Sequence, residues 1–277
     1  MSNPEPLRVA LFTLDSALSA AALRDLAVAE AGRLVLIGRS NPMRASAGGS
    51  FGQLAAHWRR SGPRLLPFLL AGYVLPQWLG TLRQATGGGA LTRLARDHGI
   101  PLHAVEDVNG PATAAALRAA RPDVILSFNF DQIFTAATLA LAPQGGLNLH
   151  PSLLPLHRGP LPAFWALREQ PARTGVTLHR LAPRIDAGAV LAQRAVELPP
   201  GTTVAAATRR LHAEGVSLCR QVLAVLAEAE RQGTPPPEPP PPAPLPYCPF
   251  PPADLLRRGP RLVDAADLLA ALRAPTG

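Results

Sequence analysis

The chain has 277 residues, of which 47% are apolar and 17% are charged, and this balance excludes a wholly disordered protein. The length predicts one large domain or two modest ones. The net charge is +8 and all 27 basic residues are arginine, which excludes lysine-dependent Schiff-base, pyridoxal phosphate and P-loop chemistry. The arginines are spread along the chain, so nucleic acid is not expected as a partner.

Short apolar runs alternate with helical patterns along most of the chain. They predict strands at residues 7–12, 33–38, 101–105, 123–128, 147–150, 174–181 and 190–196. Apolar residues at helical spacing predict helices at 16–31, 112–120 and 204–231. This order predicts an α/β fold with a Rossmann-like, mostly parallel sheet flanked by helices. The turn after the first strand, residues 13–17, has no glycine, so a dinucleotide site is not expected there.

Two regions interrupt this pattern. The pattern of residues 40–90 predicts a helical insertion. Its apolar stretch at 65–80 is shorter than a membrane-spanning helix and contains prolines. We expect this stretch to be a buried, broken helix, with contact to a membrane surface as the alternative. The proline-rich tract at residues 235–252 predicts an extended linker, and a small helix is predicted after it at 265–273. The chain therefore divides into a main domain, 1–233, and a C-terminal extension, 234–277.

The cysteine count and the N-terminus bear on cellular location. Cys219 and Cys248 are too few for a disulfide framework or a cysteine-based zinc site, and the histidines show no metal-binding spacing. Residues 1–8 are polar and lack the apolar core of a signal peptide. We therefore expect a cytoplasmic protein without a metal.

The candidate reactive residues gather between residues 145 and 193. Asn148 and His150 lie two apart on a predicted strand, so their side chains share one face near the strand's carboxyl end. An amide and an imidazole placed together can donate hydrogen bonds to a developing oxyanion. Asp186 lies in the loop between the next two strands, where its carboxylate can orient the imidazole. Thr177 and His179 share a face of the strand before that loop.

The sequences LNLHPSLLPLHRGPLPAFW and TGVTLHRLAPRIDAGAVLAQ resemble the catalytic region of the 10-formyltetrahydrofolate-dependent formyltransferases. That family includes the glycinamide ribonucleotide, methionyl-tRNA and sugar-nucleotide enzymes. The resemblance implies a catalytic trio of Asn148, His150 and Asp186. It also implies direct attack of an amine on the formyl carbon of 10-formyltetrahydrofolate, with that folate as co-substrate and no metal.

The resemblance also implies where the folate lies. It places the pterin beside the strand that precedes the catalytic strand and against the aspartate loop. The folate-binding candidates are Leu126, Phe128, Ile133, Arg184 and Ile185. Core packing is the alternative for at least half of the apolar candidates.

Four further residues are expected to support the site or the substrate. Ser152 belongs to the turn after the catalytic strand, and Thr177 and His179 lie on the neighbouring strand. Arg158 is either structural or a contact for an anionic group of the substrate.

The acceptor is not specified by the motifs. The absence of a glycine-rich loop after the first strand argues against glycinamide ribonucleotide, and the proline-rich extension replaces the β-barrel of the tRNA enzymes. HRGPLPAFWAL is closer to the sugar-nucleotide enzymes, which favours an amine or hydroxylamine of a small metabolite, a nucleotide sugar included. A methionyl-tRNA formyltransferase-like enzyme, a 10-formyltetrahydrofolate hydrolase and a non-catalytic folate-binding protein are the alternatives. The insertion at 40–90 is the candidate for acceptor choice, and its apolar stretch suggests a hydrophobic or lipid-linked amine.

Overall fold

A computed structural model describes residues 6–41, 49–85, 88–234 and 238–277. Seven strands form one sheet in the order β3-β2-β1-β4-β5-β6-β7. The strands are β1 (Val9–Leu14), β2 (Leu34–Ser40), β3 (Leu102–Val105), β4 (Val124–Phe128), β5 (Gly146–His150), β6 (Gly175–Arg180) and β7 (Val190–Ala195). The pairs from β3 through β5 are parallel, whereas β6 pairs antiparallel with both β5 and β7. The predicted α/β fold with a mostly parallel sheet is confirmed.

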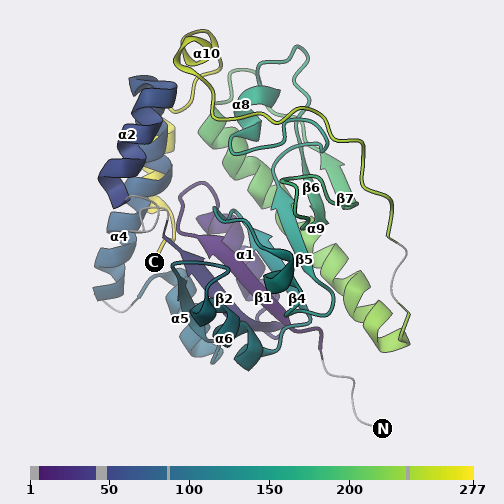
Figure 1. Cartoon of the computed structure of the whole chain (residues 1–277). Helices are drawn as coiled ribbons and strands as arrows, with labels where there is room; N and C mark the ends of the chain where they lie inside the picture. The colour runs from purple at the N-terminus through teal and green to yellow at the C-terminus, as the bar shows by residue number, and fades with distance from the viewer. Residues whose placement is uncertain (1–5, 42–48, 86–87, 235–237) are drawn as a thin grey trace.

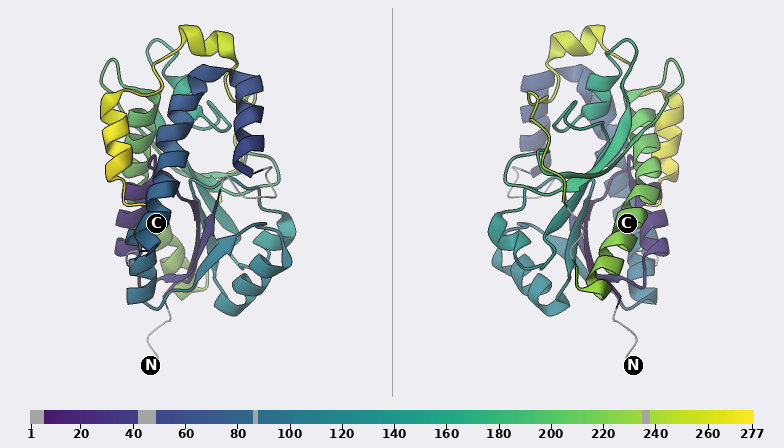
Figure 2. Two further views of the ribbon diagram at one scale, coloured as in Figure 1. Left: turned by 90° about the vertical axis from the view of Figure 1, so that its left-hand side faces the viewer. Right: turned by 90° about the vertical axis from the view of Figure 1, so that its right-hand side faces the viewer.

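Alternating side chains of the central strands feed two hydrophobic layers. On β1, Val9 and Leu11 pack into one cluster, whereas Ala10 and Phe12 pack into another. The first layer lies under α1 (Ala20–Ala29), α5 (Ala90–Asp97) and the long α9 (Val204–Gln232). The second lies toward α6 (Pro111–Ala120) and α7 (Ala136–Leu139). Helices therefore cover both faces of the sheet (Figures 1 and 2).

The insertion forms a broken helical stack beside the sheet. It comprises α2 (Gly49–Ser61), η2 (Pro63–Leu65), α3 (Leu66–Leu69), η3 (Leu70–Val74) and α4 (Leu75–Ala85). Gly62, with a φ of 69°, separates α2 from the rest, and the π-helical η3 interrupts the remainder. The expected broken helix is therefore present, although only part of it is buried. Residues 42–48 and 86–87 of the predicted insertion lie outside the described residues.

One helical stretch of the insertion also has the dimensions of a membrane span. Pro63–Arg83 contains 21 residues, with a mean hydropathy of 1.4. The same length and hydropathy occur in core helices of soluble proteins. Leu65 and Phe68 in this stretch are fully buried against the domain. Contact with a membrane through residues 65–80 remains a prediction.

The extension returns across the domain and meets the insertion. Residues 238–252 contain no helix, and α10 (Ala253–Arg258) and α11 (Ala265–Arg273) follow them. The backbone N–H of Cys248 donates to the carbonyl of Arg158 at 2.7 Å, and the indole of Trp165 donates to Pro249 at 3.1 Å. Helix α11 packs on α4 and η3. The extension thus runs along the end of the domain at which the parallel strands end (Figure 2).

Candidate active site

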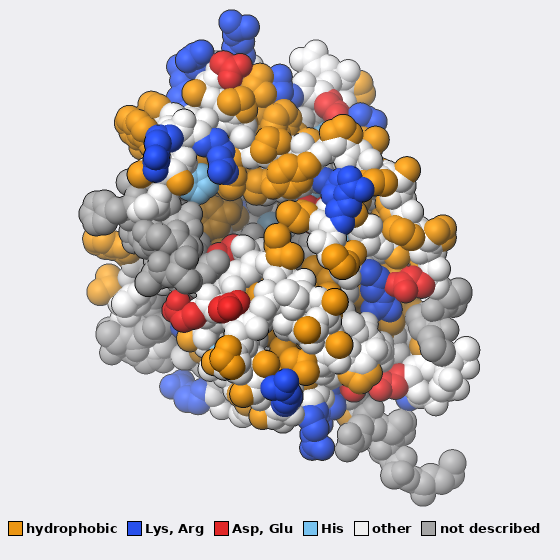
Figure 3. All heavy atoms as spheres, viewed as in Figure 1, with side chains coloured by type: hydrophobic (Ala, Val, Ile, Leu, Met, Phe, Trp, Pro, Cys, Tyr) orange, Lys and Arg blue, Asp and Glu red, His pale blue; other side chains and the backbone are white. Residues whose placement is uncertain are grey.

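A cavity of about 900 Å³ opens at the carboxyl ends of β1, β4 and β5. The chain runs from β1 outward to β2 and β3, then returns to β4 on the other side, so this is a topological switch point. Ligands of open α/β sheets bind at such points. The strands, the loop after β6, the insertion and the extension all contribute to the cavity's lining. Figure 3 shows the surface hollowed here, with pale blue histidine atoms inside the hollow.

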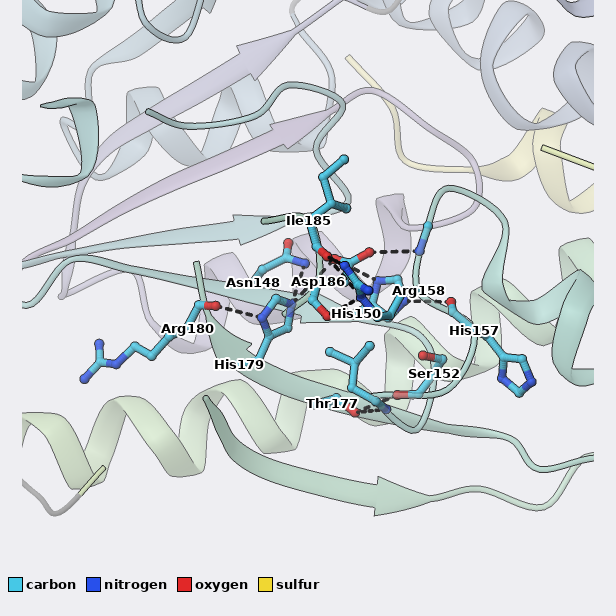
Figure 4. Close-up of polar contacts among 12 residues, drawn as sticks. Asn148, His150, Ser152, His157, Arg158, Thr177, His179, Arg180, Ile185 and Asp186 are labelled. Atoms are coloured by element: carbon cyan, nitrogen blue, oxygen red, sulfur yellow. Dashed lines mark hydrogen bonds and ion pairs between the residues drawn. The ribbon is translucent and has the colours of Figure 1, made fainter. Parts of the chain in front are cut away.

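The three predicted catalytic side chains all line this cavity. Asn148 and His150 project from β5, and Asp186 comes from the loop between β6 and β7 (Figure 4). Nδ1 of His150 lies 3.6 Å from Oδ1 of Asp186. His150 is buried, and the Asp186 side chain is 11% exposed. An amide, an imidazole and a carboxylate therefore meet at one point with little access to bulk water.

The backbone of the aspartate loop is tightly constrained. Asp186 has a φ of 48°, in the left-handed region that few residues other than glycine adopt. Its Oδ2 accepts a 2.9 Å hydrogen bond from the backbone N–H of Gly159. A Cβ at Gly188 would lie 1.9 Å from the carbonyl oxygen of Arg180, so only glycine fits there. The glycine of the D-x-G motif thus lets the loop approach β6 closely enough to present the carboxylate.

Arg158 is a buried clamp on the same loop. Its guanidinium donates hydrogen bonds to the carbonyls of Ile185, Asp186 and Leu245. The arginine is 3% exposed, so these carbonyl oxygens stabilise its charge in place of water. It does not appear among the described residues that line the cavity. Its position fits the structural one of the two predicted roles, and it ties the aspartate loop to the extension.

His179 sets the orientation of the catalytic amide. It faces Asn148 across the β5–β6 pair, and its Nδ1 donates to the carbonyl of Arg180 at 2.8 Å. Burial and the neighbouring His150 lower the pKa of His179 to about 4, so its Nε2 carries a lone pair at neutral pH. The Nδ2 of Asn148 lies 3.1 Å from this lone pair and donates to it. Since only a donor can face Nε2, the amide orientation of Asn148 is fixed.

Thr177 holds the turn that follows the catalytic strand. Its hydroxyl donates to the carbonyl of Ser152 at 2.6 Å and accepts from the backbone N–H of Leu154 at 3.1 Å. Gln193 of β7 bonds to the same hydroxyl at 2.8 Å and to the carbonyl of Leu154. Ser152 itself donates to the carbonyl of Leu156. These residues shape the turn, and the sequence analysis missed Gln193 because its strand carries no clear polar motif.

The structure separates the predicted folate-binding residues into two groups. Ile133 and Ile185 are exposed, at 57% and 38%, and line the cavity. Leu126 and Phe128 are instead buried in the core beneath α9, so their assignment to the cavity wall is corrected. Strand alternation explains this, because Ser127 is the β4 residue whose side chain reaches the cavity, and Asn129 follows directly after the strand. Arg184 is exposed and lies outside the cavity lining.

Helix α9 and the extension supply residues that the sequence analysis did not select. Thr208 and His212 of α9 line the cavity, as do Tyr247 and Phe250 of the extension. His212 donates from Nδ1 to the carbonyl of Thr208 at 2.8 Å, and its buried Nε2 has no hydrogen-bond partner. Burial lowers the pKa of His212 to about 4, so this nitrogen is an acceptor at neutral pH. No local motif marks His212, because only the packing of α9 brings it to the cavity.

No metal site is found in the described part of the chain. The histidine, cysteine, aspartate and glutamate side chains of these residues form no group of three that could hold an ion. Cys219 is buried within α9, and Cys248 lies half-buried in the extension.

The geometry can be compared with known proteins. A sequence model described as formyl transferase matches residues 76–223. The fold is similar to glycinamide ribonucleotide transformylase 1 from Symbiobacterium toebii, with 21% identity and a TM-score of 0.56 over 82% of this chain and 90% of that one. A sugar N-formyltransferase from Shewanella sp. FDAARGOS_354 has 16% identity and a TM-score of 0.52, over 96% of this chain and 87% of its own. A sugar 3N-formyl transferase in the presence of dTDP and 5-N-formyl-THF has 13% identity and a TM-score of 0.52, over 88% and 70% of the two chains.

Proposed function

Because the chain belongs to the formyl transferase family and is a formyltransferase, we propose that it transfers the formyl group of 10-formyltetrahydrofolate directly to an amine of a small molecule. The observation that carries this proposal is the convergence of Asn148, His150 and Asp186 in one buried cavity at the ends of the strands. These three groups match the chemistry of the step, which forms an oxyanion and moves one proton.

The proposed step begins when the amine lone pair attacks the formyl carbon. A C–N bond forms, and the carbonyl electrons move onto oxygen to give a tetrahedral oxyanion. The Nδ2–H of Asn148 that is not held by His179 donates to this oxygen. The imidazole of His150 is the proposed source of positive charge beside this oxygen, and Asp186 lies 3.6 Å from its Nδ1.

Collapse of the intermediate completes the transfer. The oxyanion re-forms the carbonyl as the bond between the formyl carbon and N10 breaks. The amine loses one proton and N10 gains one, so protons and electrons balance. Asp186 is the proposed relay for that proton, acting through a water molecule at the mouth of the trio.

The residues around the trio fit a folate donor on one side. Ile133, Leu181, Ala182 and Ile185 are apolar residues of the cavity lining, and the last three lie in the segment that leads to Asp186. Flat aromatic rings bind well against such walls when a few polar groups fix their orientation. We assign these residues, rather than Leu126 and Phe128, to the donor side of the cavity.

The acceptor is proposed to be a primary amine or hydroxylamine of a small metabolite. The solved structures with this fold include enzymes named for glycinamide ribonucleotide and for the N-formylation of sugars, and these names are of small-molecule acceptors. Nucleic acid is not proposed as a partner.

Release of tetrahydrofolate tests the proposal. The protein is incubated with 10-formyltetrahydrofolate alone and with a panel of primary amines. Amine-dependent release is expected, with one formamide formed for each tetrahydrofolate. Amine-independent release at the same rate would instead identify a hydrolase, and no release with any amine would identify a binding protein.

A further inference from the structure

We infer that the acceptor is an unphosphorylated primary amine carried on an apolar group. This inference rests on the proposed formyl transfer and adds the substrate class. The acceptor would occupy the part of the cavity opposite the donor side, which is formed by the end of β1, the insertion and the extension.

The anion site that an α/β fold usually offers after β1 is filled by the insertion. The carbonyl of Gly72 in η3 accepts hydrogen bonds from the backbone N–H of Ala17 at 2.9 Å and from the hydroxyl of Ser16 at 2.9 Å. The Ser16 hydroxyl also accepts from the N–H of Leu18. These donors belong to the turn between β1 and α1, where a phosphate bound at the end of β1 would otherwise use them. A phosphate could bind them only by displacing η3 from the domain.

The charges near this position also disfavour a phosphate. Asp131 and Asp186 both line the cavity. Among the described residues of the lining, Arg60 is the one arginine. Recognition of a diphosphate ordinarily uses several cationic or backbone donors, and this wall offers few.

The remaining surface of this wall is mainly apolar. Its aliphatic and aromatic side chains come from three separate segments: Leu14, Phe68, Leu69, Val74, Trp78 and Phe250. The insertion also contributes the polar residues His57, Arg60 and Tyr73. Trp78 is 71% exposed, so a large apolar side chain stands in water where the cavity meets the surface. Burying the apolar part of a substrate against this wall would be favourable, whereas burying a sugar diphosphate there would leave its polar groups unpaired.

His212 lines the same cavity and lies close enough to His150 for their charges to interact. Its Nε2 is buried, lacks a partner and has a lone pair, as described above. An N–H of the incoming amine is the kind of donor that this atom needs. The wall and His212 together suit a molecule that is apolar along its length and carries an amine at its inner end.

Two matched amines test the inference. Phenethylamine and phosphoethanolamine each carry a primary amine on a two-carbon chain, and they differ in bearing a phenyl or a phosphate group. We expect kcat/KM for formylation of phenethylamine to be higher by at least about tenfold, as burial of one aromatic ring predicts. A nucleoside diphosphate amino sugar is the third substrate, and hydroxylamine is the minimal one.

A variant pair locates the effect in the cavity. Val74→Asp places a charge in the apolar wall and is expected to lower kcat/KM for phenethylamine about tenfold or more, with little change for hydroxylamine. Val225→Asp makes the same change at an exposed position of α9 outside the cavity lining, and it should leave both rates unchanged.

The outcomes separate the inference from the proposed function. Faster formylation of phosphoethanolamine or of the nucleotide sugar than of phenethylamine would overturn the apolar acceptor and leave formyl transfer standing. Equal loss in Val74→Asp for phenethylamine and hydroxylamine would also overturn it. No formylation of any of the four substrates would remove both.

Discussion

The two walls of the cavity are held together in different ways. Around β5 and β6, nearly every functional side chain is fixed by a directional bond: His179 to Asn148, Asp186 to Gly159, and Arg158 to the aspartate loop. The opposite wall, from the insertion and the extension, is formed mainly by packed apolar side chains. Hydrogen bonds fix angles and positions, whereas apolar contacts tolerate changes of shape. We therefore expect the first wall to determine rate and the second to determine which amine is used.

The largest effect on rate is expected in the wall around β5 and β6, whose side chains are fixed by hydrogen bonds. Asn148→Ala removes the donor to the proposed oxyanion and should lower kcat by about 10²–10³-fold, the range for loss of one such donor. The KM for the amine should change little, because this contact strengthens only in the transition state. Steady-state kinetics of purified protein measures both. A loss confined to KM would mean that Asn148 binds substrate and does not assist the reaction.

The next largest effect is expected at Arg158, which holds the aspartate loop. Arg158→Lys cannot reproduce the fork of hydrogen bonds to Ile185, Asp186 and Leu245. Both kcat, by roughly tenfold, and the melting temperature should fall, because the variant frees the aspartate loop and leaves buried carbonyls unpaired. Thermal unfolding and kinetics on the same preparation test this. Unchanged stability with a higher KM for an anionic amine would instead favour the substrate-contact role.

A smaller effect is expected where the bond only orients another group. His179→Phe removes the acceptor for Asn148 and lets its amide rotate, which should lower kcat by a few-fold to about tenfold. His179→Gln can offer an oxygen to the same N–H and should recover part of the rate. Equal loss in the two variants would mean that the ring's packing, and not the hydrogen bond, matters.

The smallest effect is expected for two buried histidines, which change how the free energy of unfolding depends on pH. The pKa values of His179 and His212 are both lowered to about 4 by burial, so the folded protein binds these protons less readily than the unfolded chain. Their contribution to stability is complete above the usual pKa of about 6.5 and is lost as pH falls toward 4, by about 1.4 kcal/mol per pH unit for each histidine. Urea unfolding at several pH values measures this. His212→Gln should flatten the dependence, whereas His98→Gln, at an exposed position of the chain, should not.

The sequence was sufficient to predict the wall around β5 and β6. It was insufficient to predict the apolar wall from the insertion and the extension. Strand alternation put Asn148 and His150 on one face, and the same rule applied to β4 selects Ser127 in place of Leu126 and Phe128. The helix at 265–273 also follows from its pattern. His212, Gly72 and Phe250 reach the cavity region only through packing between segments far apart in the chain, which local periodicity does not encode.

The most direct test of the central claim follows the formyl carbon itself. 10-Formyltetrahydrofolate labelled in the formyl group is mixed with phenethylamine and the protein, and the label is located by mass spectrometry. The account predicts labelled N-formylphenethylamine from the native protein and a yield at least about 10²-fold lower from His150→Ala. Label found only as free formate, or an unchanged yield from His150→Ala, would contradict direct transfer by this trio.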